Sequence, residues 1–472
     1  MAFNSVAFLF GLLPVTLLCY YLCPARVREG RNTVLLLASL VFYAWGGLAL
    51  LPALLASCLV NWGAALLLER TSRKKALFTA VLVVNVLLLG YYKYTGFLLG
   101  NLRFLGLDTA IPSIALPAGI SFFTFQAIAY LTDVYRGSTA PERDPLRFLL
   151  FMSFFPQLLQ GPILRWSSFG PALADRRETV SDAAEGAVRF CFGLAKKVLL
   201  ADAIGQISNA AFVSGGRLTV AFAWLGAIAY TLQLYFDFSG YTDMAIGLGR
   251  IFGFRLPENF NYPYIAQSAN DFWRRWHITL SRWFRDYIYI PLGGNRVSLA
   301  KQLRNLLAVW LLTGLWHGSA WNFVLWGLYY FLFLTGEKYL WGKDLARLPR
   351  PVRHAYALVV IIVGWVLFRA TSLEQAAHML SAMFGFAPGG LWGGEAIYYL
   401  RQFRWELLMA IPATLPIKNW LLAWLAPKAE TGSRPAEAVL VIGPKALGGI
   451  LLIYSVVRLL GSTFRSFLYF QF

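Results

Sequence analysis

Charged residues are scarce in this sequence. Only 14% of its 472 residues are charged, against roughly a quarter in soluble domains, and the mean hydropathy is +0.57. A soluble protein of this length could not cover its surface with so few charges. Four windows contain no Lys, Arg, Asp or Glu at all: 1–25, 32–68, 109–132 and 305–336. Each of these windows is long enough to cross a bilayer, which takes about 20 apolar residues.

Several catalytic and ligand-binding signatures are also absent. The chain has no P-loop, no H-E-x-x-H pair, no G-x-S-x-G elbow and no G-x-G-x-x-G loop, which argues against a nucleotide-driven motor, a metalloprotease and a serine hydrolase. Only four cysteines occur, all in apolar helical sequence: Cys19, Cys23, Cys58 and Cys191. They predict inert buried thiols, neither a disulfide framework nor a metal site.

The apolar runs predict an all-α, multi-pass integral membrane protein with about eleven transmembrane helices. The first window lacks the basic start of a signal peptide, so we expect a retained helix there. Three segments are too short or too interrupted to span and are predicted to be re-entrant or interfacial: 146–164, 374–386 and 403–427. One integral domain over 1–472 is the simplest organisation. The predicted spans are 3–23, 32–50, 52–68, 76–100, 114–134, 186–212, 219–250, 305–316, 319–340, 353–370 and 446–462.

The net charge of +19 would suggest nucleic acid in a soluble protein. In a membrane protein, basic loops on the cytoplasmic side explain it better, and no nucleic-acid partner is expected. Basic residues gather at 26–31 and at 70–75, whereas the intervening turn near 46–52 is uncharged. This alternation predicts an outside N-terminus.

The segment 250–304 is too polar to span and unusually aromatic. Within it, 268–287 is predicted to be one amphipathic helix lying in the membrane interface. At about 100° per residue, four arginines share one face and the aromatic residues share the other with His277. Headgroup contact alone explains the arginines; a further hypothesis is that they hold an anionic donor. The arginines are Arg274, Arg275, Arg282 and Arg285.

His317 differs from the other histidines because it lies inside the uncharged run 305–336, in TGLWHGSAWN (Thr313–Asn322). An ionisable group within the membrane is costly and suggests function, although a buried histidine bonded to a neighbouring helix is the alternative. Gly314 and Gly318 would either open space beside the imidazole or break the helix there. Asp237 and Asp243, in DFSGYTD, are a second pair of polar residues in an apolar span. We expect them to be paired: with an arginine, with a histidine that they orient, or as part of the lining of a polar tunnel.

These residues resemble the membrane-bound O-acyltransferase family, closest to its bacterial alginate O-acetyltransferase branch. The long signature is NDFWRRWHITLSRWFRDYIYIPLGGNR, from Asn270 to Arg296, and LWHG with Trp321 matches the second, so 270–318 carries the signature residues. GPILR at 161–165, DFSGYTD at 237–243 and the aromatic end FLYFQF at 467–472 are also similar. The resemblance runs nearly end to end and is least clear over 380–445.

The resemblance implies helices around a central tunnel, with no metal and no permanently bound cofactor. It implies that His317 matches the family's near-invariant histidine and His277 its second, Asn-or-His position. It implies acetyl-CoA as a cytosolic acyl donor, and a secreted polysaccharide or an extracytoplasmic SGNH-type acetyltransferase as the receiving partner. The bacterial cytoplasmic (inner) membrane is the expected location.

Acyl transfer from a thioester to a hydroxyl needs a base, and neutral imidazole suits that role. His317 is therefore predicted to deprotonate the acceptor hydroxyl, with His277 as a second polar ligand of the thioester or its oxyanion; an acyl-histidine intermediate is the alternative. Trp276, Trp316 and Trp321 are predicted to line the tunnel, though packing explains them equally well. Other acceptors such as peptidoglycan, D-alanyl transfer to teichoic acid, and a transporter or flippase remain alternatives.

Overall fold

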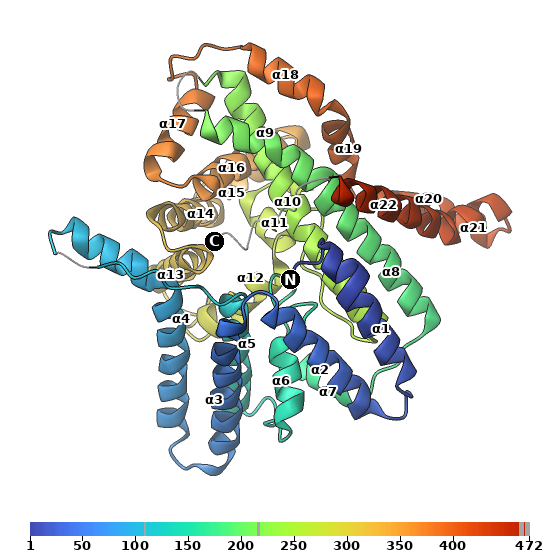
Figure 1. Ribbon diagram of the computed structural model, residues 1–472. Coiled ribbons are helices and arrows are strands. Elements are labelled where there is room, and N and C mark those ends of the chain that lie inside the picture. Colours follow the sequence, from blue (N-terminus) through green and yellow to red (C-terminus); the bar gives the residue numbers. More distant parts are fainter. Residues whose placement is uncertain (108–109, 215–217, 462–466, 468–472) are drawn as a thin grey trace. The chain divides into compact units, whose positions relative to one another are not determined.

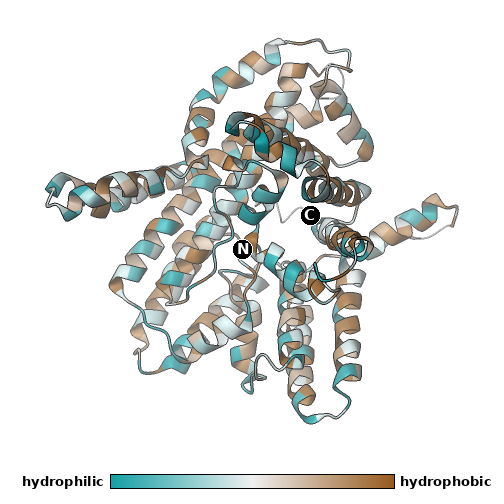
Figure 2. Ribbon diagram, turned by 180° about the vertical axis from the view of Figure 1, so that it is seen from behind, coloured by the Kyte–Doolittle hydropathy of each residue, from teal (hydrophilic) through white to brown (hydrophobic). Residues whose placement is uncertain are grey.

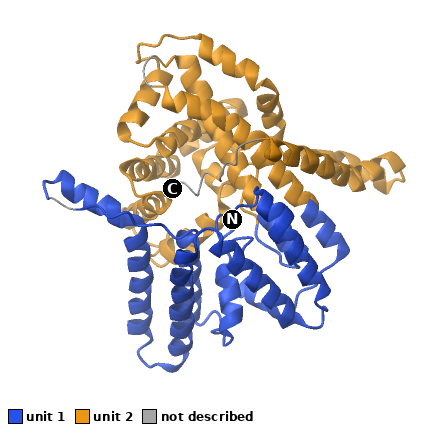
Figure 3. Ribbon diagram, in the orientation of Figure 1, with its two compact units in different colours: residues 1–187, 244–257, 469–471 blue, residues 188–243, 258–468, 472 orange. Residues whose placement is uncertain are grey.

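The computed structural model describes residues 1–107, 110–214, 218–461 and 467, and helices are the only regular elements within those ranges (Figure 1). Of the aromatic C-terminal stretch at 467–472, only Phe467 is among the described residues. Of the predicted span 446–462, only residue 462 lies outside them. The described chain divides into two compact units, formed mainly by 1–187 with 244–257 and by 188–243 with 258–468 (Figure 3).

The first unit contains the N-terminal helices. Their termini follow local sequence rules: the Asp144 carboxylate accepts the backbone N–H of Leu146 at 2.8 Å and caps the helix that Pro145 begins. Its helices are η1 (Phe8–Leu12), α1 (Leu13–Leu22), α2 (Arg28–Ala44), η2 (Leu48–Leu50), α3 (Leu51–Arg70), α4 (Lys74–Phe104), α5 (Ile120–Tyr135), α6 (Pro145–Ser153), α7 (Trp166–Ala174) and the start of α8 (Val180–Ala195).

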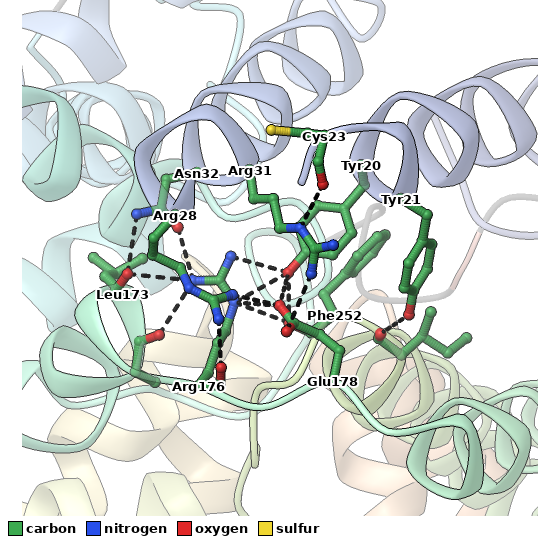
Figure 4. Close-up of polar contacts among 12 residues, drawn as sticks. Tyr20, Tyr21, Cys23, Arg28, Arg31, Asn32, Leu173, Arg176, Glu178 and Phe252 are labelled. Carbon is green, nitrogen blue, oxygen red and sulfur yellow. Dashed lines mark hydrogen bonds and ion pairs between the residues drawn. The ribbon is translucent and has the colours of Figure 1, made fainter. Parts of the chain in front are cut away.

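A buried ionic cluster ties together α1, α2 and the segment after α7 (Figure 4). Glu178 accepts hydrogen bonds from Arg28 Nη1 at 2.5 Å and from the Tyr20 hydroxyl at 2.5 Å, and Arg31 Nη1 lies 3.1 Å from its other oxygen. Arg176 donates to the Tyr20 hydroxyl and to the Phe252 carbonyl. The basic loop predicted at 26–31 therefore contributes two of its arginines to the protein interior.

Replacing Glu178 with glutamine is expected to lower the stability of the first unit by about 3 kcal/mol, because it leaves buried guanidinium groups without their carboxylate. Burial opposes the charge of Glu178, but the hydrogen bonds from Arg28 and Tyr20 and the charges of the arginines outweigh it and hold its pKa below the ordinary value. A lowered pKa stabilises the fold above the unfolded value, about 4.3. That stabilisation is lost as the pH falls through the folded value.

Thermal unfolding in detergent between pH 7 and pH 3 measures this effect. Glu185→Gln is the control, because its carboxylate is 55% exposed. Equal melting temperatures for wild type and Glu178→Gln at pH 7 would contradict the assigned role of the cluster.

The second unit holds the remaining helices, including the whole segment 258–318 in which both candidate histidines lie. They are the end of α8, η3 (Lys196–Ala201), α9 (Asp202–Val213), most of α10 (Val220–Ile251), η4 (Pro263–Ile265), α11 (Ala269–Arg275), α12 (Ile278–Phe284), η5 (Arg285–Tyr289), α13 (Leu299–His317), α14 (Trp321–Tyr339), α15 (Gly342–Arg347), α16 (Arg350–Arg369), α17 (Leu373–Met383), α18 (Gly394–Gln402), α19 (Arg404–Thr414), α20 (Ile417–Glu430), α21 (Arg434–Val441) and α22 (Gly443–Leu460).

A helix covers most of every predicted span within the described residues. Within the described part of the chain, four helical stretches are long and apolar enough to cross a membrane on length and composition: 48–70, 74–104, 350–369 and 434–460. The pair α19 and α20, bent by 60°, would be a fifth span if it crosses as one broken helix. Hydrophobic residues run along these helices and polar residues gather at the turn between α3 and α4 (Figure 2). The protein is a multi-pass, all-α membrane protein, and the total of about eleven spans stays a prediction.

The prediction of one continuous amphipathic helix over 268–287 is wrong. The backbone breaks at Trp276 and His277, so that α11 ends at Arg275 and α12 starts at Ile278. His277 adopts the left-handed conformation, with φ 46° and ψ 53°, which ends a right-handed helix. Periodicity missed the break because α11 and α12 both keep their aromatic residues buried.

Candidate active site

His317 is the last residue of α13 and is 4% exposed. Gly318 follows in an extended conformation, so the helix ends directly after the imidazole. This is one of the two outcomes that the flanking glycines predicted. The other, open space beside the ring, is wrong: a side chain at Gly314 would lie 2.3 Å from the Phe323 carbonyl oxygen, and one at Gly318 would overlap the Phe323 ring at 2.0 Å. The glycines instead let α14 pack closely against α13.

Among the residues that the structure describes, three aromatic rings contact the His317 imidazole. The ring centroids of Trp316, Phe368 and Trp326 lie 4.8, 5.0 and 5.2 Å from it, each nearly perpendicular to the imidazole. Edge-to-face contacts of this kind fix the plane of a ring. These aromatic residues come from α13, α14 and α16 and form what we call the His317 cage.

The start of α14 is fastened to the end of α16 by Asn322. Its Nδ2 donates to the Ala370 carbonyl at 2.7 Å and to the Leu367 carbonyl at 3.3 Å. Asn322 is buried, and these carbonyls lie at the helix end, where backbone acceptors lack partners within the helix. Asn322 thereby fixes the part of α16 that carries Phe368. Sequence reasoning quoted Asn322 without giving it a role.

His277 lies in the break between α11 and α12 and is completely buried. Its ring contacts Phe238 at 4.8 Å and Trp316 at 6.0 Å between centroids. Trp316 thus contacts both candidate histidines, although they are far apart in the sequence. Burial lowers the pKa of His277 to about 3, because desolvation disfavours the imidazolium form. His277 is therefore a neutral imidazole at physiological pH.

The segment that carries His277 is anchored at its start by Glu337 of α14. The Glu337 carboxylate accepts the backbone N–H groups of Ala269 at 2.7 Å and Asn270 at 2.9 Å. A negative charge at these unpaired donors is favourable, and Ser268 caps the same helix through Asp271 N–H. Sequence reasoning missed Glu337. Its position directly after the uncharged run 305–336 was the available signal.

The four candidate arginines differ in their partners. Arg275 Nε lies 2.8 Å from Asp271, and Arg285 Nε lies 2.7 Å from Asp286. Arg274 and Arg282 are exposed and have no ion-pair partner among the described residues. The opposite side chains of the same segment are buried, including Trp273, Trp276 and Phe284. The two sides of the segment are thus distributed as expected, despite the break in the helix.

The three tryptophans predicted to line the tunnel differ in their exposure to solvent. Trp276 and Trp316 are 1% and 4% exposed and pack near the histidines, whereas Trp321 is 54% exposed at the start of α14. Trp276 lies against Trp365 at 4.9 Å and Phe260 at 5.0 Å. A role for these residues in lining a tunnel stays a prediction.

Asp237 and Asp243 belong to two ion-pair networks rather than to one site with the histidines. Lys197 Nζ lies 2.5 Å from Asp237 and 2.9 Å from Asp202. Lys196 Nζ lies 2.7 Å from Asp243. Arg189 bridges the second network, at 2.9 Å from Asp243 and 2.5 Å from Glu258. The three cations on α8 and η3 were not identified from the sequence, although Lys196 and Lys197 stand out inside a predicted span.

Within the described ranges, no three His, Cys, Asp or Glu residues gather as a metal site would require. The imidazoles of His277 and His317 both contact the buried Trp316 indole. His317 is the last residue of α13, and His277 lies in the break between α11 and α12. Such groups can accept or transfer a proton in a site sheltered from water.

Comparison with known proteins identifies the class of enzyme. Residues 142–373 match the model of the membrane-bound O-acyltransferase family. The chain is 40% identical to the probable alginate O-acetylase of Azotobacter vinelandii over the whole of both chains. It is 38% identical to the peptidoglycan O-acetyltransferase of Helicobacter pylori, over 81% of this chain and 80% of that one. It is 32% identical to the teichoic acid D-alanyltransferase of Bacillus subtilis, over 53% and 66%.

Proposed function

Because this chain belongs to the membrane-bound O-acyltransferase family and is an O-acyltransferase, we propose that it takes acetyl groups from cytosolic acetyl-CoA for O-acetylation of an exported, alginate-type polysaccharide. The observation that supports this acceptor is the 40% identity, over the whole of both chains, to a probable alginate O-acetylase. The membrane would be the bacterial inner membrane. An extracytoplasmic SGNH-type acetyltransferase would be the partner that completes transfer to the polymer.

The proposed reaction is direct transfer at His317. The imidazole takes the proton of the acceptor hydroxyl, and the hydroxyl oxygen forms a bond to the thioester carbonyl carbon. The carbon–sulfur bond then breaks, the thiolate of coenzyme A leaves, and the imidazolium returns its proton to that sulfur. Burial within the His317 cage supports this role, because exclusion of water protects the thioester from hydrolysis.

The donor would approach through a tunnel between the helices, with Trp276, Trp316 and Trp321 along it. Its negatively charged phosphates would contact the exposed arginines of α11 and α12. Arg274 and Arg282 are the best candidates, since Arg275 and Arg285 already pair with neighbouring aspartates. Guanidinium groups bind phosphate through paired hydrogen bonds.

Reversing the charge of Arg274 or Arg282 to glutamate is expected to raise the KM for acetyl-CoA by about 10-fold to 100-fold, because a charge-assisted hydrogen bond contributes about 1.5–3 kcal/mol. The kcat at saturating donor should change little. Arg275→Glu and Arg285→Glu should have smaller effects. Lys343→Glu, an exposed cation on α15, is the control. An unchanged KM in both Arg274→Glu and Arg282→Glu would restrict these arginines to contacts with lipid headgroups.

One observation favours a second acceptor. The peptidoglycan O-acetyltransferase of Helicobacter pylori is 38% identical over four-fifths of this chain, so peptidoglycan is the runner-up. D-alanyl transfer is less well supported, because the teichoic acid enzyme matches about half of this chain.

The acceptor is tested with purified protein in lipid vesicles and acetyl-CoA labelled in its acetyl group. Deacetylated alginate, de-O-acetylated peptidoglycan and no polymer form three parallel reactions, each with and without a purified extracytoplasmic SGNH-type acetyltransferase. Alkali-labile label on alginate is the expected result. Label on peptidoglycan alone would favour the runner-up, and no release of coenzyme A with any acceptor would overturn the proposed function.

A further inference from the structure

A third polar residue beside the two histidines, Asn259, contacts His277 through the Nδ1 atom of the ring. Asn259 is completely buried and lies just outside the signature that starts at Asn270. Its Oδ1 accepts from the Thr279 backbone N–H at 3.1 Å and from the Thr279 hydroxyl at 2.9 Å, and it lies 3.2 Å from His277 Nδ1. Its backbone carbonyl accepts the Ile278 N–H at 3.0 Å. Asn259 thus contacts both His277 in the break and the first two residues of α12.

These contacts determine which nitrogen of His277 carries the proton. The Thr279 N–H can only donate, so the atom that faces it must be the amide oxygen of Asn259. An oxygen can only accept from Nδ1, which therefore carries the hydrogen. Because His277 is neutral, the other ring nitrogen, Nε2, has a lone pair. Nε2 is buried and has no hydrogen-bond partner within the described part of the chain.

The backbone of His277 indicates that this arrangement is specifically maintained. His277 and Tyr262 are the only residues other than glycine with positive φ among those that the structure describes. A left-handed conformation is unfavourable for a bulky side chain and persists only where its surroundings enforce it. A buried acceptor without a partner is also unfavourable. His277 thus has both an unfavourable backbone conformation and an unpaired buried acceptor, and it contacts the same Trp316 ring as His317.

We propose that Asn259 is a positioning residue that holds His277 with its proton on Nδ1, so that Nε2 accepts a hydrogen bond from a neutral N–H or O–H of a bound reactant. In this form His277 cannot donate a hydrogen bond to an oxyanion, so it orients a reactant instead. The partner is a group other than the reacting hydroxyl, whose single proton goes to His317. Amide N–H groups of the pantetheine arm and spare hydroxyls of a sugar both supply this chemistry.

The inference rests on the proposed function for the identity of the reactants but not for the state of the ring. The lowered pKa of His277, about 3, supports it, because Nε2 then remains an acceptor throughout the physiological range. His277 is at the same time too weak a base to remove a hydroxyl proton efficiently, since a general base works best with a pKa near the operating pH.

Nitrogen-15 NMR of the histidine-labelled full-length protein in lipid tests the tautomer without any assay of activity. The chain has four histidines, and His277→Asn identifies the signals of this one. The expected wild-type spectrum has a protonated Nδ1 and an unprotonated Nε2. In Asn259→Leu the acceptor is lost, and the proton should move largely to Nε2. Asn261→Leu, an exposed neighbour, should leave the spectrum unchanged.

Asn259→Asp is a second variant that keeps the proposal testable if Asn259→Leu does not fold. A carboxylate still accepts from Nδ1 and keeps the tautomer, but it stabilises the imidazolium form. The acid side of the pH–rate profile should therefore move to higher pH.

Steady-state kinetics identify which reactant His277 binds. Asn259→Leu should lower kcat/KM at least tenfold. A raised KM for acetyl-CoA would identify the donor as the bonded reactant, and a raised KM for the polymer would identify the acceptor.

A wild-type His277 that carries its proton on Nε2 would overturn the inference, and so would an unchanged tautomer in Asn259→Leu. Neither result depends on acetyl transfer. If instead the tautomer is as expected but no acetyl transfer occurs with any acceptor, the proposed function fails while the positioning role of Asn259 stands.

Discussion

Replacing Lys197 with methionine is expected to destabilise the second unit by about 3–5 kcal/mol, the range found when one partner of a buried ion pair is removed. The Lys197 ammonium is the shared partner of Asp237 and Asp202, at 2.5 and 2.9 Å. The side chains of Lys197 and Asp237 are each only 2% exposed. Methionine would fill similar space but remove the ammonium group that both carboxylates contact, and a buried charge is costly unless it is paired.

Thermal unfolding in detergent, monitored by tryptophan fluorescence, measures this loss. The double variant Lys197→Met with Asp237→Leu should recover much of the stability, because an apolar pair can replace a buried ion pair. Lys196→Met is a matched control on the same helix. Its side chain is 24% exposed, and Arg189 still pairs with Asp243, so its effect should be smaller. A Lys197→Met protein as stable as wild type would contradict the assignment of this network to stability.

Replacing His317 with alanine is expected to lower kcat by a factor of about 10²–10⁴, the usual contribution of a positioned general base. The loss should fall on kcat and not on the KM for acetyl-CoA, because the proton leaves the hydroxyl only in the transition state. Steady-state release of coenzyme A with a thiol reagent measures both constants. The melting temperature should fall only slightly, since the cage keeps its three aromatic rings.

His354→Ala is the control for that experiment. His354 is also a histidine on a helix of the second unit, and its Nδ1 lies 3.0 Å from the Ala266 carbonyl. It contacts backbone and not the His317 cage, so its removal should leave kcat within about twofold of wild type, as expected for a residue remote from the transition state. An equal loss in both variants would indicate a general structural defect, not a missing base.

Much of the fold followed from the sequence because hydropathy acts locally. Long uncharged windows predicted α3, α5 and α14, and the end of α13 at Gly318 was one of the two outcomes that the glycines beside His317 predicted. The burial of Trp276 and the exposure of Arg274 and Arg282 were also predictable, since sidedness survives a break when the next helix restores the same face.

What the sequence could not provide were the contacts between distant residues. Asn259 lies 18 positions from His277, Lys197 lies 40 from Asp237, and Glu337 lies 68 from Ala269. No local period links such pairs. The break at His277 was missed for a related reason: its left-handed backbone depends on Asn259 and Thr279, whereas the residues around it favour a helix. The predicted space beside His317 was filled by Phe323 from the next helix.

A single-turnover experiment distinguishes direct acetyl transfer promoted by His317 from transfer through an acetylated form of this chain. Excess protein in lipid vesicles is mixed with labelled acetyl-CoA, with its partner and the polymer present or absent, and label on protein and polymer is counted after rapid quenching. We predict that wild type places label on the acceptor in the first turnover without a labelled form of this chain, and that His317→Ala places none. A folded His317→Ala protein that labels the acceptor at the wild-type rate would contradict the account.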